Sequence, residues 1–234
     1  LRMGRLPEAW IAPPATRELR ELVRHRAKLV ALRSNLTCQV HAVLAACGVQ
    51  VPMTDLFGAG GQGLLERVVL APAFRARVSS TRRLIETLDF EIELFTSLAS
   101  GRLRGHPGYT AIQAISGVGP ILAAVFVAEI GEVNRFRRAA QLASWAGLTP
   151  RHHESDTTVR RGPITKRGCR LVRQAAVEAI QRTDKHSRLD RVRDQAGQRR
   201  GNNIGKVAAA RELIELIFYG LRDGHIRALN RHSA

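Results

Sequence analysis

Hydrophobic residues recur at helical spacing through the first part of the chain. Leu22, Leu29, Leu36 and Val43 follow one another at every seventh position. A seven-residue repeat of apolar side chains is typical of a long helix that packs one face against another helix. The pattern therefore predicts a helix over residues 15–47.

A second apolar stripe follows a glycine-rich interruption. The run GAGGQG, Gly58 to Gly63, holds four glycines, and their backbone entropy predicts a loop of roughly a dozen residues here. The stripe after it predicts a second helix that ends near Leu98, because its apolar positions alternate in spacings of three and four residues. These positions are Val78, Thr81, Ile85, Leu88, Ile92 and Phe95.

The two long helices are expected to pair antiparallel within the chain, or to pair with another subunit. Core packing inside one chain explains the stripes as well as pairing between subunits does, so the pattern leaves this choice open. We expect a homo-oligomer, a dimer or a tetramer, because an isolated helical hairpin exposes apolar surface on both flanks.

The composition changes after SGRLRGHPG, Ser100 to Gly108, and this places a domain boundary near Pro107. The fold class predicted from the whole pattern is mainly α, with a long antiparallel helical or coiled-coil pair followed by a small helical domain that contains a helix-hairpin-helix. A short hairpin is expected around Thr157 to Val159. The further short helices are predicted over residues 109–115, 120–130, 137–146, 164–182 and 204–222. The expected segments are a linker at 1–14, a coiled-coil region at 15–106 and a C-terminal domain at 107–234.

The charge balance is strongly basic. The chain holds 37 Lys and Arg against 20 Asp and Glu, a net charge of +17. Residues 151–211 alone hold sixteen Lys and Arg and six acids, which is more than half of the net charge. This balance indicates a polyanionic partner, with nucleic acid as the first hypothesis, because basic side chains release the counterions of phosphates. An Arg-rich composition set by a GC-rich genome is the alternative explanation.

Other classes of protein are disfavoured by composition. Cys38, Cys47 and Cys169 form no C-x-x-C pair, which argues against a zinc module or a disulfide scaffold. The apolar stretch from Gly117 to Ala128 is shorter than the about 20 residues that span a bilayer. The first residues also lack the apolar segment of a signal peptide. We therefore expect a cytoplasmic protein without a membrane partner.

A tight turn, Ser116 to Pro120, separates two short apolar helices and resembles a helix-hairpin-helix element. Gly117 and Gly119 would let the backbone approach a phosphate, and the start of the second helix would stabilise its charge. Gly117, Val118 and Gly119 are therefore predicted to contact DNA. The alternative is a turn in which glycine is required only by the crossing of the helices.

The segment Arg151 to Gly168 contains Ser155 among many charged side chains. A serine hydroxyl needs a base, a metal or strong stabilisation of the transition state to act as a nucleophile. The composition alone makes Ser155 a weak candidate, because none of the possible bases has a defining spacing. The possible bases are His152, His153, Glu154 and Asp156. The cations predicted to bind phosphate are Arg151, Arg160, Arg161, Lys166 and Arg167.

No metal site is predicted in this chain. His152, His153 and Glu154 are adjacent in an irregular segment, and adjacent residues rarely direct their side chains at one ion. A DNA glycosylase is also disfavoured, because the positions after the hairpin where that class has its catalytic Lys or Asp hold Ile121 and Ala139. A non-catalytic module that binds DNA or RNA stays open as an alternative function.

The order of short motifs between Ala114 and Ala179 carries a family resemblance. G-V-G-P, E-I-G, Q-L-A-S-W-A-G-L-T-P, H-x-S and R-R-G-x-I-T-K follow one another. This run resembles the C-terminal transposase domain of the insertion-sequence 110 family, particularly its 1111-type branch. Gly4 to Pro14 is similar to the junction that precedes the family's coiled coil, and Gly205 to Gly224 is similar to its closing helix.

The resemblance implies an activity and partners. Members of the family join a RuvC-like nuclease domain, with a metal-binding Asp/Glu tetrad, to a coiled coil and a serine-bearing domain. They recombine DNA under the guidance of a bridge RNA encoded by the element. Ser155 falls on the family's nucleophile, which attacks a DNA phosphate and forms a covalent phosphoserine link. The family commonly has Gly after this serine, whereas this chain has Asp156.

The resemblance also sets an expectation for the cofactor. The family's acidic tetrad lies upstream of the GRLPEAW junction, and only Leu1, Arg2 and Met3 precede that junction here. We therefore expect that these residues lack the N-terminal nuclease domain, where Mg²⁺ is expected to bind, and that they hold no cofactor themselves. We also expect that they do not recombine DNA alone.

Overall fold

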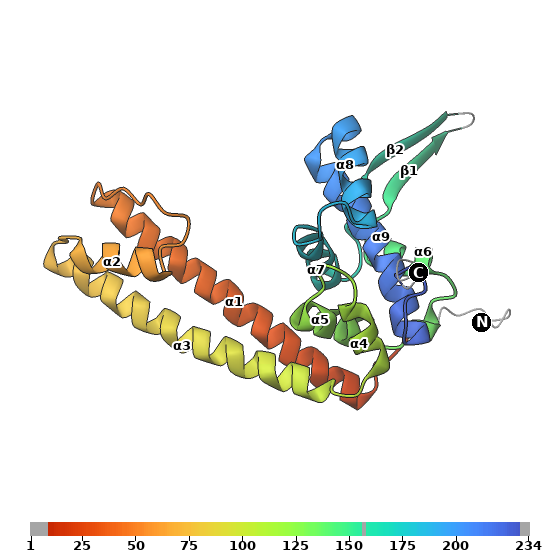
Figure 1. Cartoon of the computed structure of the whole chain (residues 1–234), viewed down its shortest axis with the longest axis horizontal. Helices are drawn as coiled ribbons and strands as arrows, with labels where there is room; N and C mark the ends of the chain where they lie inside the picture. Colours follow the sequence, from red (N-terminus) through yellow and green to blue (C-terminus); the bar gives the residue numbers. More distant parts are fainter. Residues whose placement is uncertain (1–8, 156–157, 230–234) are drawn as a thin grey trace. The chain divides into compact units, whose positions relative to one another are not determined.

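The computed structural model describes residues 9–155 and 158–229, and its described part is mainly helical, as predicted (Figure 1). The two strands are β1 (Pro150–Ser155) and β2 (Thr158–Ile164). The helices of the first half are α1 (Pro14–Ala46), α2 (Ala59–Arg67), α3 (Pro72–Arg102), α4 (Pro107–Gln113) and α5 (Pro120–Ile130). A 3₁₀ turn (Val133–Arg135) then precedes α6 (Ala139–Trp145), α7 (Arg170–Ile180), α8 (Arg188–Arg200) and α9 (Asn202–Asp223). None of the described helices is long and apolar enough to cross a membrane.

The chain divides into two compact units. One consists of Arg24–Leu98, and the other combines the described residues of Leu1–Val23 with those of Ala99–Ala234. Helices α1 and α3 each contribute to both units. The predicted boundary near Pro107 and the predicted segments 1–14, 15–106 and 107–234 stay predictions.

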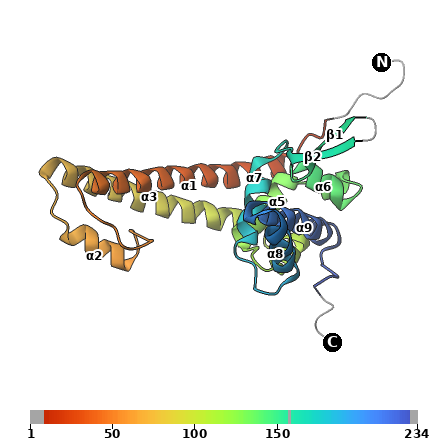
Figure 2. The same ribbon diagram turned by 90° about the horizontal axis from the view of Figure 1, so that it is seen from above.

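In the unit Arg24–Leu98, α1 and α3 lie side by side and antiparallel (Figures 1 and 2). Val43, Val78 and Ile85 of the predicted apolar stripes are buried in the core of this unit, and polar side chains also join the two helices. Arg26 Nε donates to Thr96 Oγ1 at 2.6 Å, and Arg33 forms an ion pair with Asp89. The buried core of this unit comprises Val40, Val43, Leu44, Leu56, Leu65, Leu70, Val78 and Ile85.

The loop predicted over Gly58–Gly63 is wrong, because α2 begins at Ala59 and includes three of these glycines. A side chain at Gly61 would place its Cβ only 2.0 Å from the carbonyl oxygen of Leu56. The close approach needs a glycine, and it brings buried Leu56 and Leu65 into the core. Burial of these side chains outweighs the low helix propensity of glycine.

The second unit is built around α5, which is apolar on all sides and therefore suited to a fully buried position. Phe126, Ile130 and Ala123 on this helix have no exposed surface. Helix α7 packs against α5, and the long helix α9 packs against α4, α6, α7 and α8. Helix α5 begins at Pro120 and ends at Ile130, as the pattern predicted.

Two elements of this unit differ from the prediction. The helix expected over 164–182 begins only at Arg170, because β2 continues to Ile164 and Gly168 has a left-handed backbone. Helix α8 is not among the predicted helices, because residues 188–200 form a polar, charged run for which a solvated helix face and a nucleic-acid contact are both open from the sequence. Its N-cap Ser187 accepts a hydrogen bond from the Asp190 N–H at 3.1 Å, and this satisfies one of the donors of the first turn.

Candidate nucleic-acid and catalytic site

The two strands place Ser155 at the end of a hairpin. Strands β1 and β2 are antiparallel, with Ser155 opposite Thr158 and Pro150 opposite Ile164. Ser155 is the last residue of β1 and is exposed. The intervening Asp156 lies outside the described residues. The sequence predicted a hairpin in this region, and the strands extend further on both sides than expected.

The other predicted residues of the hairpin lie on its strands. Arg160 is opposite His153 and Arg161 is opposite His152 in the strand register. The side chains of residues 152–154 and 158–161 lie outside the described part of the structure. Arg160 and Arg161 therefore stay predicted phosphate ligands, and the base that would activate Ser155 is not assigned.

At the end of the hairpin away from Ser155, main-chain hydrogen bonds join the segments before β1 and after β2. The Thr165 N–H donates to the Thr149 carbonyl at 2.9 Å, and the Lys166 N–H donates to the Gly147 carbonyl at 3.2 Å. Lys166 has φ of 53°, a left-handed backbone that is uncommon for residues other than glycine. The bonds hold the exposed side chains of Lys166 and Arg167 beside the hairpin. Arg151, near the start of β1, is exposed as well.

Two glycines allow the main chain to approach closely at this end of the hairpin. Gly147 has φ of 73°, and a Cβ there would lie 2.2 Å from the carbonyl oxygen of Arg167. Gly168 has φ of 78°, and a Cβ there would lie 1.8 Å from the carbonyl oxygen of Trp145. Side chains fit neither position, so both glycines are required for the segment after β2 to pack onto the end of α6.

Arg173 ties the same segments together. Its Nη1 donates to the carbonyl oxygen of Ala146 at 2.9 Å and to that of Arg167 at 3.3 Å. Arg173 lies on α7, so one guanidinium joins this helix, the end of α6 and the segment after β2. We name the set Gly147, Gly168 and Arg173 the hairpin cradle. Arg173 belongs to the basic run of residues 151–211, and nothing in its local sequence indicates this contact.

A buried carboxylate lies next to the cradle. Glu129, at 2% exposure, accepts a hydrogen bond from Cys169 Sγ at 3.4 Å. Burial raises the pKa of the Cys169 thiol, and the Glu129 carboxylate raises it further. The thiol therefore stays protonated at neutral pH and is a poor nucleophile.

Cation–π contacts of Arg135 connect the start of the unit to α6. The Arg135 guanidinium lies over the rings of Trp10, Phe136 and Trp145, at 4.5, 4.3 and 5.0 Å from their centroids. Burial lowers the pKa of Arg135, and the nearby Arg20 adds to this effect. Trp10 and Trp145 are the two tryptophans of the chain, so their fluorescence reports on this packing.

The two glycines of the Ser116–Pro120 turn have different surroundings. Gly117 has φ of 87°, and a Cβ there would lie 2.3 Å from the carbonyl oxygen of Ala179, so the crossing of helices requires this glycine. Val118 is 3% exposed, and its N–H donates to the Ile115 carbonyl at 3.0 Å. Both residues therefore take part in packing within the chain.

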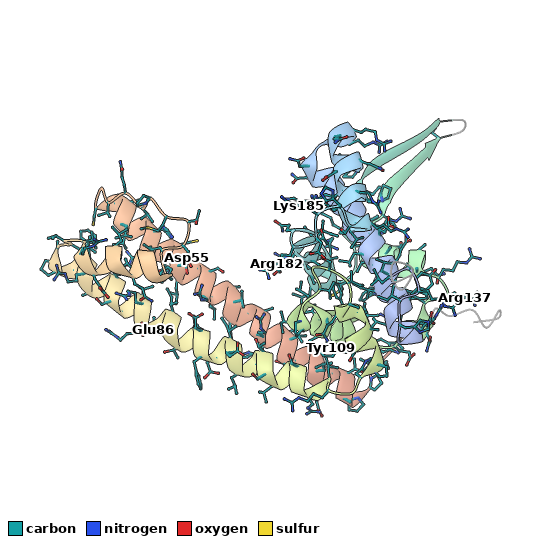
Figure 3. All side chains as sticks on the ribbon, viewed as in Figure 1. Asp55, Glu86, Tyr109, Arg137, Arg182 and Lys185 are labelled. Atoms are coloured by element: carbon teal, nitrogen blue, oxygen red, sulfur yellow. The ribbon has the colours of Figure 1, made fainter. Side chains whose placement is uncertain are left out.

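Gly119 is the open position of this turn. Nothing lies within 4 Å of a Cβ built there, and the residue is the N-cap of α5. The turn lines a groove of about 590 Å³ together with Glu178, Arg182 and Asp184 (Figure 3 labels Arg182). The two carboxylates oppose the attraction of a phosphate to the start of α5. DNA contact at Gly117, Val118 and Gly119 stays a prediction, and Gly119 offers the most accessible backbone.

The described residues contain no group of three or more His, Cys, Asp or Glu that could hold a metal ion.

Comparisons with known proteins give a consistent relationship. Residues 109–197 match the family model described as "Transposase IS116/IS110/IS902 family". The chain is 30% identical over 206 residues to a "probable family 20 transposase" of Pseudomonas aeruginosa, in an alignment that covers 83% of this chain and 60% of that protein. It is 29% identical over 211 residues to the "insertion element IS110 uncharacterized 43.6 kDa protein" of Streptomyces coelicolor, which covers 89% of this chain and 47% of that protein.

A third relative, the "transposase for insertion sequence element IS1111A" of Coxiella burnetii, is 30% identical over 115 residues, covering 46% of this chain and 31% of that protein. The chain spans 60% of the length of the Pseudomonas aeruginosa relative and less than half of the other two.

Proposed function

Because this chain belongs to the IS116/IS110/IS902 family of transposases, we propose that it acts in the transposition of an insertion sequence, with Ser155 as the nucleophile that attacks a DNA phosphodiester. The observation that carries the proposal is the position of Ser155. It is exposed as the last residue of β1, so the hydroxyl is accessible to a phosphate that approaches the hairpin from outside.

The proposed step exchanges one phosphoester for another. Ser155 Oγ forms a bond to phosphorus, and one bridging P–O bond of the DNA strand breaks. The hydroxyl proton passes to a base, and the deoxyribose oxygen that leaves takes up a proton. The product is a covalent phosphoserine link, which a hydroxyl of another DNA end reverses to join the strands.

Basic side chains at the base of the hairpin support this chemistry. Lys166, Arg167 and Arg151 are exposed, and cations stabilise the charge that develops on phosphate oxygens in the transition state. The hairpin cradle fixes the segment that carries Lys166 and Arg167, so these charges are held in place before DNA binds. Arg160 and Arg161 on β2 are proposed to add to the same site.

The proposed partners are DNA, the bridge RNA of the element and further copies of this chain. Self-association is proposed because recombination brings two DNA sites together, and because α3 exposes large apolar side chains. These include Leu84, Phe90 and Leu94, at 53%, 70% and 42% exposure. A dimer or tetramer would be seen as a multiple of 25.8 kDa in light scattering.

A covalent-trapping experiment tests the role of Ser155. Radiolabelled duplex DNA that carries the element's ends and a nick beside the cleavage site is mixed with the protein, Mg²⁺ and the matching RNA. Denaturing electrophoresis then separates protein that has become attached to label. The test uses this chain and, in parallel, the product of the gene's complete open reading frame. We expect an adduct that Ser155→Ala abolishes and that Ser80→Ala, at an exposed serine on α3, retains.

Two outcomes would contradict the proposal. An adduct of normal yield in Ser155→Ala would place the nucleophile elsewhere. Salt-dependent DNA binding without an adduct in any preparation would instead favour a non-catalytic module that binds nucleic acid.

A further inference from the structure

We propose that the tip of the α8–α9 hairpin, residues Gln198–Lys206, is a second contact for the backbone of duplex DNA. The inference rests on the proposed function to the extent that the chain binds DNA. It adds a surface that lies outside the β1–β2 hairpin that carries Ser155, which we call the serine hairpin, and outside the Ser116–Pro120 turn.

The first observation is the charge of the tip. Residues 195–211 contain no Asp or Glu, whereas they include Arg199, Arg200 and Lys206. Arg199 and Arg200 are exposed, and Lys206 is half-buried. In the part of the chain that the structure describes, these three side chains form no ion pair. Their charge is therefore available to a partner, in contrast to Arg211, which pairs with Glu215 at 3.7 Å.

The second observation is a groove at the same place. It has a volume of about 590 Å³, and the polar side chains of Gln198, Asn202 and Lys206 line it. Asp194 is the one carboxylate among its lining residues, and Arg193 Nη2 contacts it at 3.1 Å, so its charge is compensated. Amide and cationic groups are those that proteins commonly use to bind phosphate and sugar oxygens.

The third observation is that the two helices pack closely at the tip. A Cβ at Gly205 would lie 2.3 Å from the carbonyl oxygen of Arg193 and 3.0 Å from Gly197 Cα, so the two helices touch through their backbones. A single residue, Gly201 with φ of 95°, joins them. The cations at the tip are therefore held on a fixed scaffold, which reduces the entropic cost of binding.

The fourth observation concerns the choice of partner. The groove has no aromatic side chain among its lining residues on which bases of a single strand could stack. The tip also projects to the same side of its unit as the serine hairpin, towards the top of Figure 1. Because the groove offers no stacking platform for a single strand, duplex DNA is the partner that fits its amide and cationic lining.

The test is a comparison of charge-matched triple variants. The first variant carries Arg199→Gln, Arg200→Gln and Lys206→Gln. The control removes three exposed cations from α3, with the substitutions Arg75→Gln, Arg77→Gln and Arg83→Gln. The dissociation constant of each protein is measured for a 30-base-pair DNA duplex over a series of salt concentrations, and for an RNA hairpin in parallel. Circular dichroism confirms that each variant is folded.

The logarithm of the association constant falls linearly with the logarithm of the salt concentration, and we call the steepness of this fall the salt slope. We expect the tip variant to have a shallower salt slope, by about 0.9 for each phosphate that the protein no longer neutralises and by up to about 2.7 in all. The control should keep a slope close to that of the wild type. An equal decrease in both triple variants would show only a general effect of net charge and would overturn the proposal. A larger decrease in affinity for the RNA hairpin than for the DNA duplex would also overturn it, by identifying RNA as the partner.

The proposed function and this inference fail in different ways. Normal duplex binding by the tip variant, together with an adduct that depends on Ser155, would reject the tip and leave the proposed chemistry intact. Absence of the adduct in every preparation, with a reduced salt slope in the tip variant alone, would reject the nucleophile and support the tip.

Discussion

The hairpin cradle and the Ser116–Pro120 turn both depend on glycine, but they use it differently. Gly147 and Gly168 each have a left-handed backbone and face a main-chain carbonyl oxygen. In the turn, Gly117 does the same, whereas Gly119 is open to solvent. Both cradle glycines are therefore packing positions, and the cradle serves as a scaffold for the serine hairpin. The turn combines one packing glycine with one position that a ligand can reach.

The largest effect is expected for Gly168→Ala. A Cβ would lie 1.8 Å from the carbonyl oxygen of Trp145, and the left-handed backbone adds strain. We expect the free energy of unfolding to fall by about 3 kcal/mol. Denaturation followed by tryptophan fluorescence measures this change. Gly60→Ala, at an open helical position, is the control and should raise stability by up to about 1 kcal/mol. Equal stability of Gly168→Ala and the wild type would contradict the closed cradle.

Gly117→Ala and Gly119→Ala separate the two uses of glycine within one turn. Gly117→Ala should lower the free energy of unfolding by about 2 kcal/mol, because its Cβ would meet the Ala179 carbonyl. Gly119→Ala replaces an N-cap residue in open space and should cost less than about 1 kcal/mol. If the turn binds phosphate, Gly119→Ala also weakens duplex binding in a titration. Unchanged binding would assign the whole turn to packing.

Arg173→Gln tests whether the cradle positions the serine hairpin. The change removes charged hydrogen bonds to the Ala146 and Arg167 carbonyls and should cost about 1–2 kcal/mol of stability. The segment that carries Lys166 and Arg167 is then held less firmly, so covalent adduct formation should slow while the salt slope of DNA binding stays unchanged. Arg173→Lys retains a donor and should recover part of the rate. A rate unaffected by Arg173→Gln would limit this residue to a structural role.

Local signals predicted much of the fold. Helix α5 was predicted with its observed ends, because Gly119 and Pro120 mark its start and Gly131 ends it with φ of 63°. The apolar stripe of α1 was equally clear. Helix α2 was missed because its glycines lower the local helix signal, and the charged run of α8 left a solvated helix face as only one of two open explanations. Both are stabilised by contacts between residues distant in the sequence, such as Arg193 with Gly205.

The candidate site was predictable only in part. The exposed position of Ser155 at a turn agrees with the polar, charged composition around it, whereas its proposed role came from the family resemblance. The cradle could not be predicted, because Gly147 and Arg173 are far apart in the sequence and neither has a local motif that indicates a contact. An arginine in a basic run gives no sign of whether it binds DNA or a carbonyl of its own chain.

The smallest expected effect concerns the buried pair beside the cradle. Burial raises the pKa of the Cys169 thiol, and the Glu129 carboxylate raises it further. The folded protein therefore holds this proton more tightly than the unfolded chain does. The stabilisation is complete below the ordinary thiol pKa of about 8.5 and is lost as the pH rises above it. The decline should stay under about 1 kcal/mol by pH 10, because solvent screens a partly exposed group.

Urea denaturation between pH 7 and pH 10 measures this decline, and Cys169→Ala should flatten it. Cys38→Ala removes an exposed thiol on α1 and should retain the decline. A decline of equal size in Cys169→Ala and the wild type would assign the pH dependence to other groups. The cradle would then be closed by the main-chain contacts of its glycines and by Arg173, without a contribution from the protonated thiol.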